Sequence, residues 1–217
     1  MHLILARHGE TASNRDRLGL GRKDVPLTDR GRLQAEALAE SLQSLPVVAV
    51  YSSPLLRAVD TARCIAAGHG LDVLTDAGLT EMDVGEMDGL TFEEMRERYS
   101  DFLLRWVTPE GATLRMPGGG ESLQDVQVRV CESVRRMAER HRDDFVAAVS
   151  HNFTIRALIC HALNLPLCEF RRLRHDLAST SVLDVKGERM TLVRLNDTCH
   201  LEARGLEERH GDETAGR

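Results

Sequence analysis

The chain has 217 residues, of which 42% are hydrophobic and 29% are charged, and 28 basic against 34 acidic residues give a net charge of −6. This composition is typical of one large or two small globular domains. It provides no overall positive field for nucleic acid or an anionic membrane, so neither partner is expected. The five cysteines are odd in number and form no CxxC pair, which favours reduced thiols in the cytoplasm over disulfides or zinc. Neither a signal peptide nor a segment of transmembrane length is expected.

The N-terminal region reads as a strand, a loop and a helix. Residues 2–6 (HLILA) form an apolar run that predicts a short buried strand. The polar, glycine-containing stretch 13–28 is expected to be a loop. Thr28 is a suitable N-cap for a helix over 29–45. The expected buried face of this helix consists of Leu33, Ala37, Leu38 and Leu42.

A second strand and helix follow the same pattern. Residues 46–53 (PVVAVYSS) predict a strand that ends in a serine directly before a proline. Because proline is favoured at the first position of a helix after a serine cap, we expect a helix over 54–68 that stops at Gly68. Residues 71–75 predict a third short strand, and the acidic stretch 80–89 predicts a loop.

The middle of the chain contains two predicted helices separated by a loop. Thr91 and Glu94 form a capping-box pattern at the start of a helix that extends to residue 106. The stretch 108–122 is rich in proline and glycine and is expected to be a loop. Ser122 then caps a helix over 123–141, whose apolar residues recur at helical spacing.

The C-terminal region predicts a strand over 144–150, a helix over 151–165 and a β-hairpin over 181–196. Alternating strands and helices predict an α/β fold, a three-layer sandwich with a mostly parallel central sheet and helices on both faces. The hairpin would add an antiparallel strand at one edge. We expect a single domain over 1–203 and a polar, flexible tail over 204–217.

Polar side chains gather where the predicted strands end, which is where α/β sheets bind ligands. Arg7 and His8 follow the first strand, Ser52, Ser53 and Arg57 the second, Glu81 the third, and His151 with Asn152 the fourth. Arginine suits phosphate oxygens, a neutral imidazole can attack phosphorus, and a carboxylate can give a proton to a leaving alcohol. Taken singly, each residue has an ordinary structural explanation. Their coincidence at four strand ends predicts a phosphate site.

The other histidines and the glycine-rich loop do not suggest a cofactor. His161 follows His151 by ten residues, which is not the i, i+4 spacing of a metal pair. The PGGGE loop (117–121) lacks the pattern of a nucleotide-binding P-loop and is expected to be a flexible turn beside the pocket. We therefore predict no metal.

Six stretches in order resemble the histidine phosphatase superfamily, in its phosphoglycerate-mutase-like branch with the Arg-His-Gly motif. They are LARHGET, DVPLTDRGRLQA, SSPLLRAVDTA, TEMDVGEMDGLT, GGGES and VSHNFTIRAL. The resemblance implies that His8 becomes a phosphohistidine and that Glu81 is the general acid and base. It also implies that the phosphoryl group or the substrate is bound by Arg7, Asn14, Gly21, Arg57, His151 and Asn152. The family requires no metal or nucleotide cofactor.

Three departures from the family pattern concern the surroundings of the site. Leu20 stands where many relatives have glutamine, Met87 lies where they have an aromatic residue, and Asn152 replaces a common glycine. None removes a catalytic group. The resemblance therefore leaves the substrate open among phosphoserine, α-ribazole phosphate, sugar phosphates and phosphoglycerates.

The resemblance is compatible with three functions: a phosphatase, a phosphoglycerate mutase and a non-catalytic interaction module. The segment between the Glu81 loop and His151 is shorter than in the cofactor-dependent mutases, which favours a phosphatase over a phosphoglycerate mutase. A non-catalytic interaction module is disfavoured because the catalytic set is intact. Arg22, Lys23 and Arg115 are candidates for binding a substrate carboxylate, or are ordinary surface charges. The sequence leaves a homodimer open.

Overall fold

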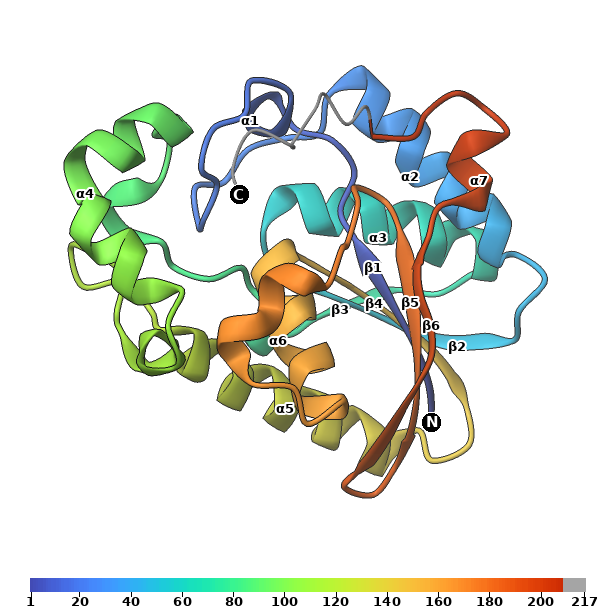
Figure 1. Ribbon diagram of the computed structural model, residues 1–217. Coiled ribbons are helices and arrows are strands. Elements are labelled where there is room, and N and C mark those ends of the chain that lie inside the picture. The colour runs from blue at the N-terminus through green and yellow to red at the C-terminus, as the bar shows by residue number, and fades with distance from the viewer. Residues whose placement is uncertain (209–217) are drawn as a thin grey trace.

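Six strands form one central sheet in the order β3-β2-β4-β1-β5-β6 in the computed structural model, which describes residues 1–208 (Figure 1). The strands are β1 (His2–Arg7), β2 (Val47–Ser52), β3 (Val73–Thr75), β4 (Phe145–Ser150), β5 (Thr180–Lys186) and β6 (Arg189–Asp197). The first four are mutually parallel, whereas β5 runs antiparallel to β1 and β6 antiparallel to β5. The predicted α/β fold with an antiparallel strand near one edge is confirmed.

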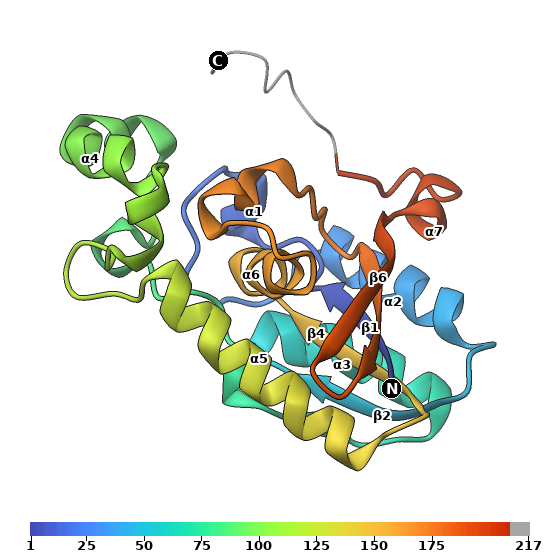
Figure 2. The same cartoon turned by 60° about the horizontal axis from the view of Figure 1, so that its bottom comes forward.

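Helices cover both faces of this sheet (Figure 2). They are α1 (Ala12–Arg15), α2 (Asp29–Leu42), α3 (Leu56–His69), α4 (Phe92–Trp106), α5 (Leu123–Arg140), α6 (Asn152–Ala162) and α7 (Cys199–Glu202). Helices α2 and α3 pack on one face, and α5 and α6 pack on the other. Helix α4 stands away from the sheet, beyond the N-terminal end of α5. No helix within residues 1–208 is both long and apolar enough to cross a membrane.

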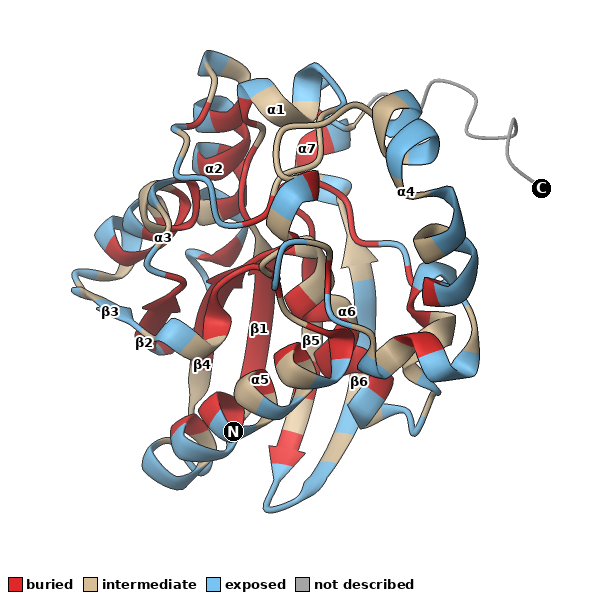
Figure 3. Ribbon diagram, turned by 90° about the vertical axis from the view of Figure 1, so that its left-hand side faces the viewer, coloured by how far each residue is buried: buried red, intermediate tan, exposed pale blue. Residues whose placement is uncertain are grey.

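The alternation of β1 side chains explains why the strand is apolar throughout. Leu3 and Leu5 belong to the core beneath α5 and α6, whereas Ile4 and Ala6 belong to the core beneath α2 and α3. All four are at most 1% exposed, and the central strands are buried along their length in Figure 3. A parallel strand covered on both faces requires such a continuous apolar run. The loop that follows β1 therefore leaves a rigid strand.

The predicted helix caps are present. Thr28 caps α2, and Thr91 and Ser122 each form a capping box at the start of α4 and α5. The predicted buried face of α2 is wrong at Leu33, which is 49% exposed, while Gln34 is 1% exposed. Gln34 can be buried because its amide oxygen accepts from the Glu10 N–H and its amide nitrogen donates to the Leu206 carbonyl.

Helix α3 differs from the prediction at both ends. It begins at Leu56 rather than at Pro54, because the Ser53 hydroxyl accepts from the Leu55 N–H and leaves the next two residues outside the helix. It continues through Gly68 and ends at His69, and the following Gly70, with a φ of 66°, has the left-handed conformation typical of a glycine cap. The expected loop over 13–28 also contains the end of the short helix α1.

The first residues of the expected tail pack against α2. Leu206 lies in a small apolar cluster with Ala37, Ala178 and Leu201. The Leu206 carbonyl accepts from the Gln34 amide at 2.8 Å. These contacts bring residues 204–208 back toward the end of β1, and residues 209–217 lie outside the described part of the chain.

Candidate active site

His8 lies at the end of β1 and is held from both sides. Its backbone N–H donates to Ser150 at the end of β4, and its carbonyl accepts from Ala178. The ring is 3% exposed, and Nδ1 lies 2.7 Å from the Gly9 carbonyl. Because a carbonyl can only accept, Nδ1 carries the proton and Nε2 keeps a lone pair. Burial, with the charges of Arg57 and Arg7, holds the pKa of His8 well below its ordinary 6.5.

Arg57 projects from the first turn of α3 and is fully buried. Its Nε donates to His8 Nε2 at 3.3 Å, which confirms that this nitrogen accepts. Its two terminal nitrogens donate to the carbonyls of Gly21 and Lys23 at 2.8 and 2.9 Å. Burial lowers the pKa of Arg57 to about 10, so the guanidinium stays charged at neutral pH beside the histidine.

His151 follows β4 and precedes α6. Its ring centroid is 5.0 Å from that of His8, and its Nε2 lies 2.7 Å from the Ser53 hydroxyl. Burial, with the charges of Arg57 and His8, holds the pKa of His151 well below 6.5. Within residues 1–208, its buried Nδ1 has no hydrogen-bond partner. The two histidines therefore meet as neutral rings at the centre of the sheet's carboxyl edge.

Arg7 completes the positive side of the site. Its Nη1 donates to the His175 carbonyl at 2.6 Å and lies 3.9 Å from a carboxylate oxygen of Glu208. Its Nε is buried and has no partner in the described part of the chain. One edge of this guanidinium is thus fixed by the protein, while Nε can still donate to a ligand.

Glu81 lies at the N-terminus of α6. Its carboxylate is 2.8 Å from the Met82 N–H and 3.3 Å from the N–H groups of Phe153 and Thr154. The side chain is buried, with the residue 3% exposed. Backbone donors at the helix start therefore fix this carboxylate close to His151.

The remaining predicted residues occupy different roles in the geometry. Asn14 completes the capping box of α1, because its side-chain oxygen accepts from the N–H and hydroxyl of the N-cap residue Thr11. Gly21 contributes its carbonyl to Arg57. Asn152 is the first residue of α6, and its Oδ1 is buried without a partner within residues 1–208. Since an amide can be turned over, this position can present either a donor or an acceptor.

The candidate cations for a substrate carboxylate are largely engaged by the protein. Arg22 pairs with Glu121 at 2.9 Å, and Arg115 pairs with Asp125 at 3.2 Å. Lys23 is exposed. Among residues 1–208, no group of three or more His, Cys, Asp or Glu side chains is arranged to hold a metal ion.

Sequence reasoning missed His175, and it identified Ser53 without its contact to His151. His175 is 1% exposed and holds Arg7 through its carbonyl, and no local pattern distinguishes it from other histidines. Ser53 was located at a strand end, but its hydrogen bond to His151 depends on β2 and β4 being neighbours. Chemically, the site combines a neutral histidine lone pair, two guanidinium groups, a second histidine and a buried carboxylate.

The chain is similar to known proteins over nearly its whole length. Residues 3–198 match the histidine phosphatase superfamily (branch 1). Phosphoserine phosphatase 1 of Hydrogenobacter thermophilus is 36% identical over 92% of this chain and 93% of its own length. Phosphoglycerate mutase-like protein 4 of Arabidopsis thaliana is 35% identical over 99% and 94%. The solved structure of a mycobacterial glucosyl-3-phosphoglycerate phosphatase with VO3 is 33% identical, covers 91% of this chain and 99% of its own, and superposes with a TM-score of 0.82. The resemblance noted in the motifs is thus confirmed, and the chain belongs to the histidine phosphatase superfamily.

Proposed function

We propose that the protein hydrolyses a small phosphate monoester through a phosphohistidine on His8, without a metal or other cofactor. Nε2 of His8 attacks phosphorus, so that an N–P bond forms while the P–O bond to the alcohol breaks. Glu81, in its protonated form, gives its proton to the departing oxygen. Water then attacks the phosphohistidine, Glu81 takes the proton, and phosphate and free His8 are regenerated.

One observation carries this proposal: the orientation of the His8 ring. The Gly9 carbonyl holds Nδ1–H, and the lone pair of Nε2 lies beside the Arg57 guanidinium. Arg57, Arg7 and His151 can then bind phosphoryl oxygens and stabilise the negative charge of the transition state. The buried atoms on Arg7, His151 and Asn152 that have no partner among residues 1–208 are suited to the same ligand.

A phosphatase is favoured over a mutase by the way the site is covered. The segment between Glu81 and His151 consists mainly of α4 and α5, and α4 stands off from the sheet. We expect this short cover to leave a phosphohistidine open to attack by water. Arg22 and Arg115, which could bind the carboxylate of a phosphoglycerate, are paired with Glu121 and Asp125 instead. The phosphoserine phosphatase relative agrees with hydrolysis.

A phosphoglycerate mutase is the second candidate, because a relative with a mutase-like name is 35% identical over 99% of this chain. The two are separated by supplying 3-phosphoglycerate with and without 2,3-bisphosphoglycerate and measuring free phosphate and 2-phosphoglycerate. We expect phosphate release. Dominant formation of 2-phosphoglycerate would overturn the choice.

The central experiment combines a substrate panel with removal of the nucleophile. Phosphate release is measured from an aryl phosphate and from phosphorylated metabolites, including phosphoserine, sugar phosphates and α-ribazole phosphate. His8→Ala should abolish release and prevent labelling of the protein by substrate phosphate. Retained turnover in that variant would refute the mechanism. A cytoplasmic location and the absence of nucleic-acid and membrane partners stay predictions, and the oligomeric state stays open.

A further inference from the structure

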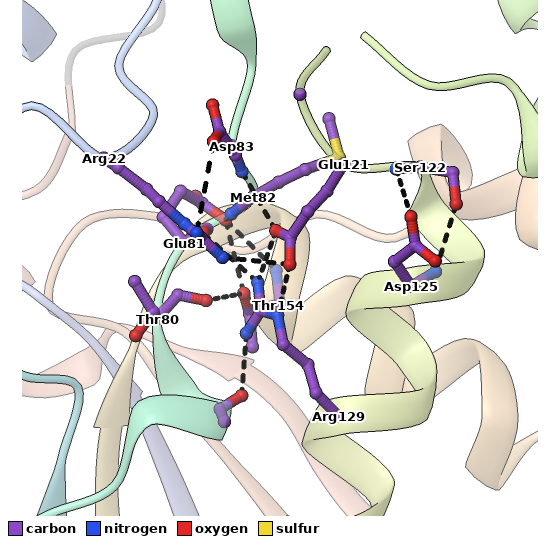
Figure 4. A network of polar contacts seen from close by, with 12 residues as sticks. Arg22, Thr80, Glu81, Met82, Asp83, Glu121, Ser122, Asp125, Arg129 and Thr154 are labelled. Atoms are coloured by element: carbon purple, nitrogen blue, oxygen red, sulfur yellow. Dashed lines mark hydrogen bonds and ion pairs between the residues drawn. The ribbon is translucent and has the colours of Figure 1, made fainter.

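The glycine-rich loop that precedes α5 contains an acidic residue at the centre of a polar network. Glu121 Oε1 lies 2.9 Å from Arg22 and 3.0 Å from Arg129, and Oε2 lies 3.1 Å from Arg129 and 3.0 Å from the Asp83 N–H. Its backbone N–H also donates to the Asp83 carbonyl at 2.9 Å. Figure 4 shows both arginines converging on this carboxylate. Glu121 thus links two arginines and the Asp83 backbone, and the glycine-rich loop is not the simple flexible turn that the sequence predicted.

Both arginines also donate hydrogen bonds to the backbone carbonyl of Glu81. Arg129 Nη2 donates to the Glu81 carbonyl at 3.2 Å, and Arg22 Nε donates to the same oxygen at 3.4 Å. Arg129 Nη1 also donates to the Gly78 carbonyl at 2.8 Å. The network therefore joins α5 and the glycine-rich loop to the segment 78–83, which includes the proposed proton donor.

The network has two arms, one through Arg129 and one through Arg22, and they differ in how far they are buried. The side chains of Glu121 and Arg129 are 14% and 19% exposed, whereas that of Arg22 is 43% exposed. The contact between Glu121 and Arg129 is bidentate, which fixes direction as well as distance. Because solvent screens exposed pairs more strongly, the Arg129 arm should hold the segment more firmly than the Arg22 arm.

Glu81 is consequently held at two points by separate parts of the fold. Backbone N–H groups at the start of α6 hold its carboxylate, and the arginines hold its carbonyl. We infer that Glu121, acting through Arg129 and Arg22, is a positioning residue that sets where Glu81 delivers its proton. This inference rests on the proposed function. It gives the GGGES stretch a role in placing the proton donor, which is separate from the binding of phosphate.

Leaving-group dependence tests this role. A poor leaving group, such as the alcohol of an alkyl phosphate, needs the proton from Glu81, whereas p-nitrophenolate departs without it. A displaced Glu81 should therefore slow alkyl phosphate hydrolysis selectively, and misplacements of about 1 Å can cost about a hundredfold. Loss of packing alone would slow both substrates together.

The experiment measures kcat and KM for p-nitrophenyl phosphate and glycerol phosphate in full-length variants. Glu121→Gln should lower the alkyl-to-aryl ratio of kcat/KM, which reports the step in which the alcohol leaves, by about ten- to a hundredfold. Arg22→Ala should lower this ratio less. In a Glu81→Gln background, Glu121→Gln should change the ratio no further. Asp125→Asn is the matched control, since Asp125 belongs to the capping box of α5 beside the same loop and pairs with Arg115 rather than with Arg22 or Arg129.

The outcomes separate this inference from the proposed function. An unchanged ratio in both Glu121→Gln and Arg22→Ala, with normal hydrolysis by the unaltered enzyme, would overturn the positioning role alone. Equal shifts in the Asp125→Asn control would overturn it as well, because the effect would then be one of loop stability. Failure of the unaltered enzyme to release phosphate from either ester would overturn the proposed function, and with it this inference.

Discussion

His175 should couple the stability of the protein to pH through the backbone that holds Arg7. The ring lies 2.8 Å from the Ser179 hydroxyl and 3.2 Å from the Ser181 hydroxyl. Ser179 also donates to the Asp176 carbonyl, so it accepts from His175 Nδ1–H, and Nε2 is left as the acceptor for Ser181. The native hydrogen bonds therefore require a neutral ring.

The magnitude follows from the difference between the folded and unfolded states. Burial, with the charges of Arg7 and Arg156, lowers the pKa of His175 from 6.5 to about 3. Between these values the unfolded chain binds a proton that the folded protein does not, so stability falls as pH falls below 6.5. At pH 5 the difference is 1.5 pH units at about 1.36 kcal/mol each, or about 2 kcal/mol.

The assay is urea unfolding of the unaltered protein and His175→Asn at pH 7.5 and pH 5. The destabilisation caused by the substitution should be about 2 kcal/mol smaller at pH 5, because the variant has lost the group that titrates. His8 and His151 are present in both proteins, so their contributions cancel. His161→Asn, at an exposed position, controls for the substitution itself. Equal destabilisation by His175→Asn at both pH values would refute the reasoning.

Four further predictions address the surroundings of the site. Gly31→Ala should destabilise the protein by about 1–3 kcal/mol in urea unfolding and lower kcat, since its Cβ would lie 2.1 Å from a carbonyl oxygen of the loop after β1; a neutral effect would contradict the close approach. Ser53→Ala should lower kcat/KM about tenfold by leaving His151 Nε2 unsatisfied, and unchanged kinetics would exclude this role. Glu208→Gln should lower the inhibition constant of inorganic phosphate about two- to fivefold, because a carboxylate 3.9 Å from Arg7 disfavours the binding of an anion there. Weaker inhibition by phosphate in this variant would show that Glu208 instead orients the arginine. A chelator should leave phosphate release unchanged, and a loss restored by added metal would contradict the mechanism.

The elements that the sequence predicted correctly are those with local signals. Caps at Thr28, Thr91 and Ser122 place helix starts because the cap and its N–H partner are three residues apart. The start of α3 was misplaced because Ser53 satisfies a turn and His151 rather than the first turn of a helix. Such competition between a local signal and a tertiary partner cannot be read from neighbouring residues.

In the site, too, the residue types could be predicted from local sequence, whereas the tertiary contacts could not. Strand ends identified His8, Arg57, Glu81 and His151 as a group, but not the contacts that orient them. The His8 ring is set by the adjacent Gly9 carbonyl, whereas two of the donors that hold the Glu81 carboxylate come from a helix more than seventy residues later. Residue types at strand ends therefore predict chemistry, while the direction of each group depends on the assembled fold.

The meeting of the two histidines follows from strand register. In the pairing of β1 with β4, Arg7 lies opposite Ser150, so His8 and His151 leave the sheet together from neighbouring central strands. A shift of one residue in this pairing would turn the buried side chains of one strand toward the opposite face. That shift is opposed along the whole of β1, because Leu3 and Leu5 fill one core and Ile4 and Ala6 fill the other. The 5.0 Å separation of the two rings is therefore maintained by apolar packing beneath the site as much as by polar contacts within it.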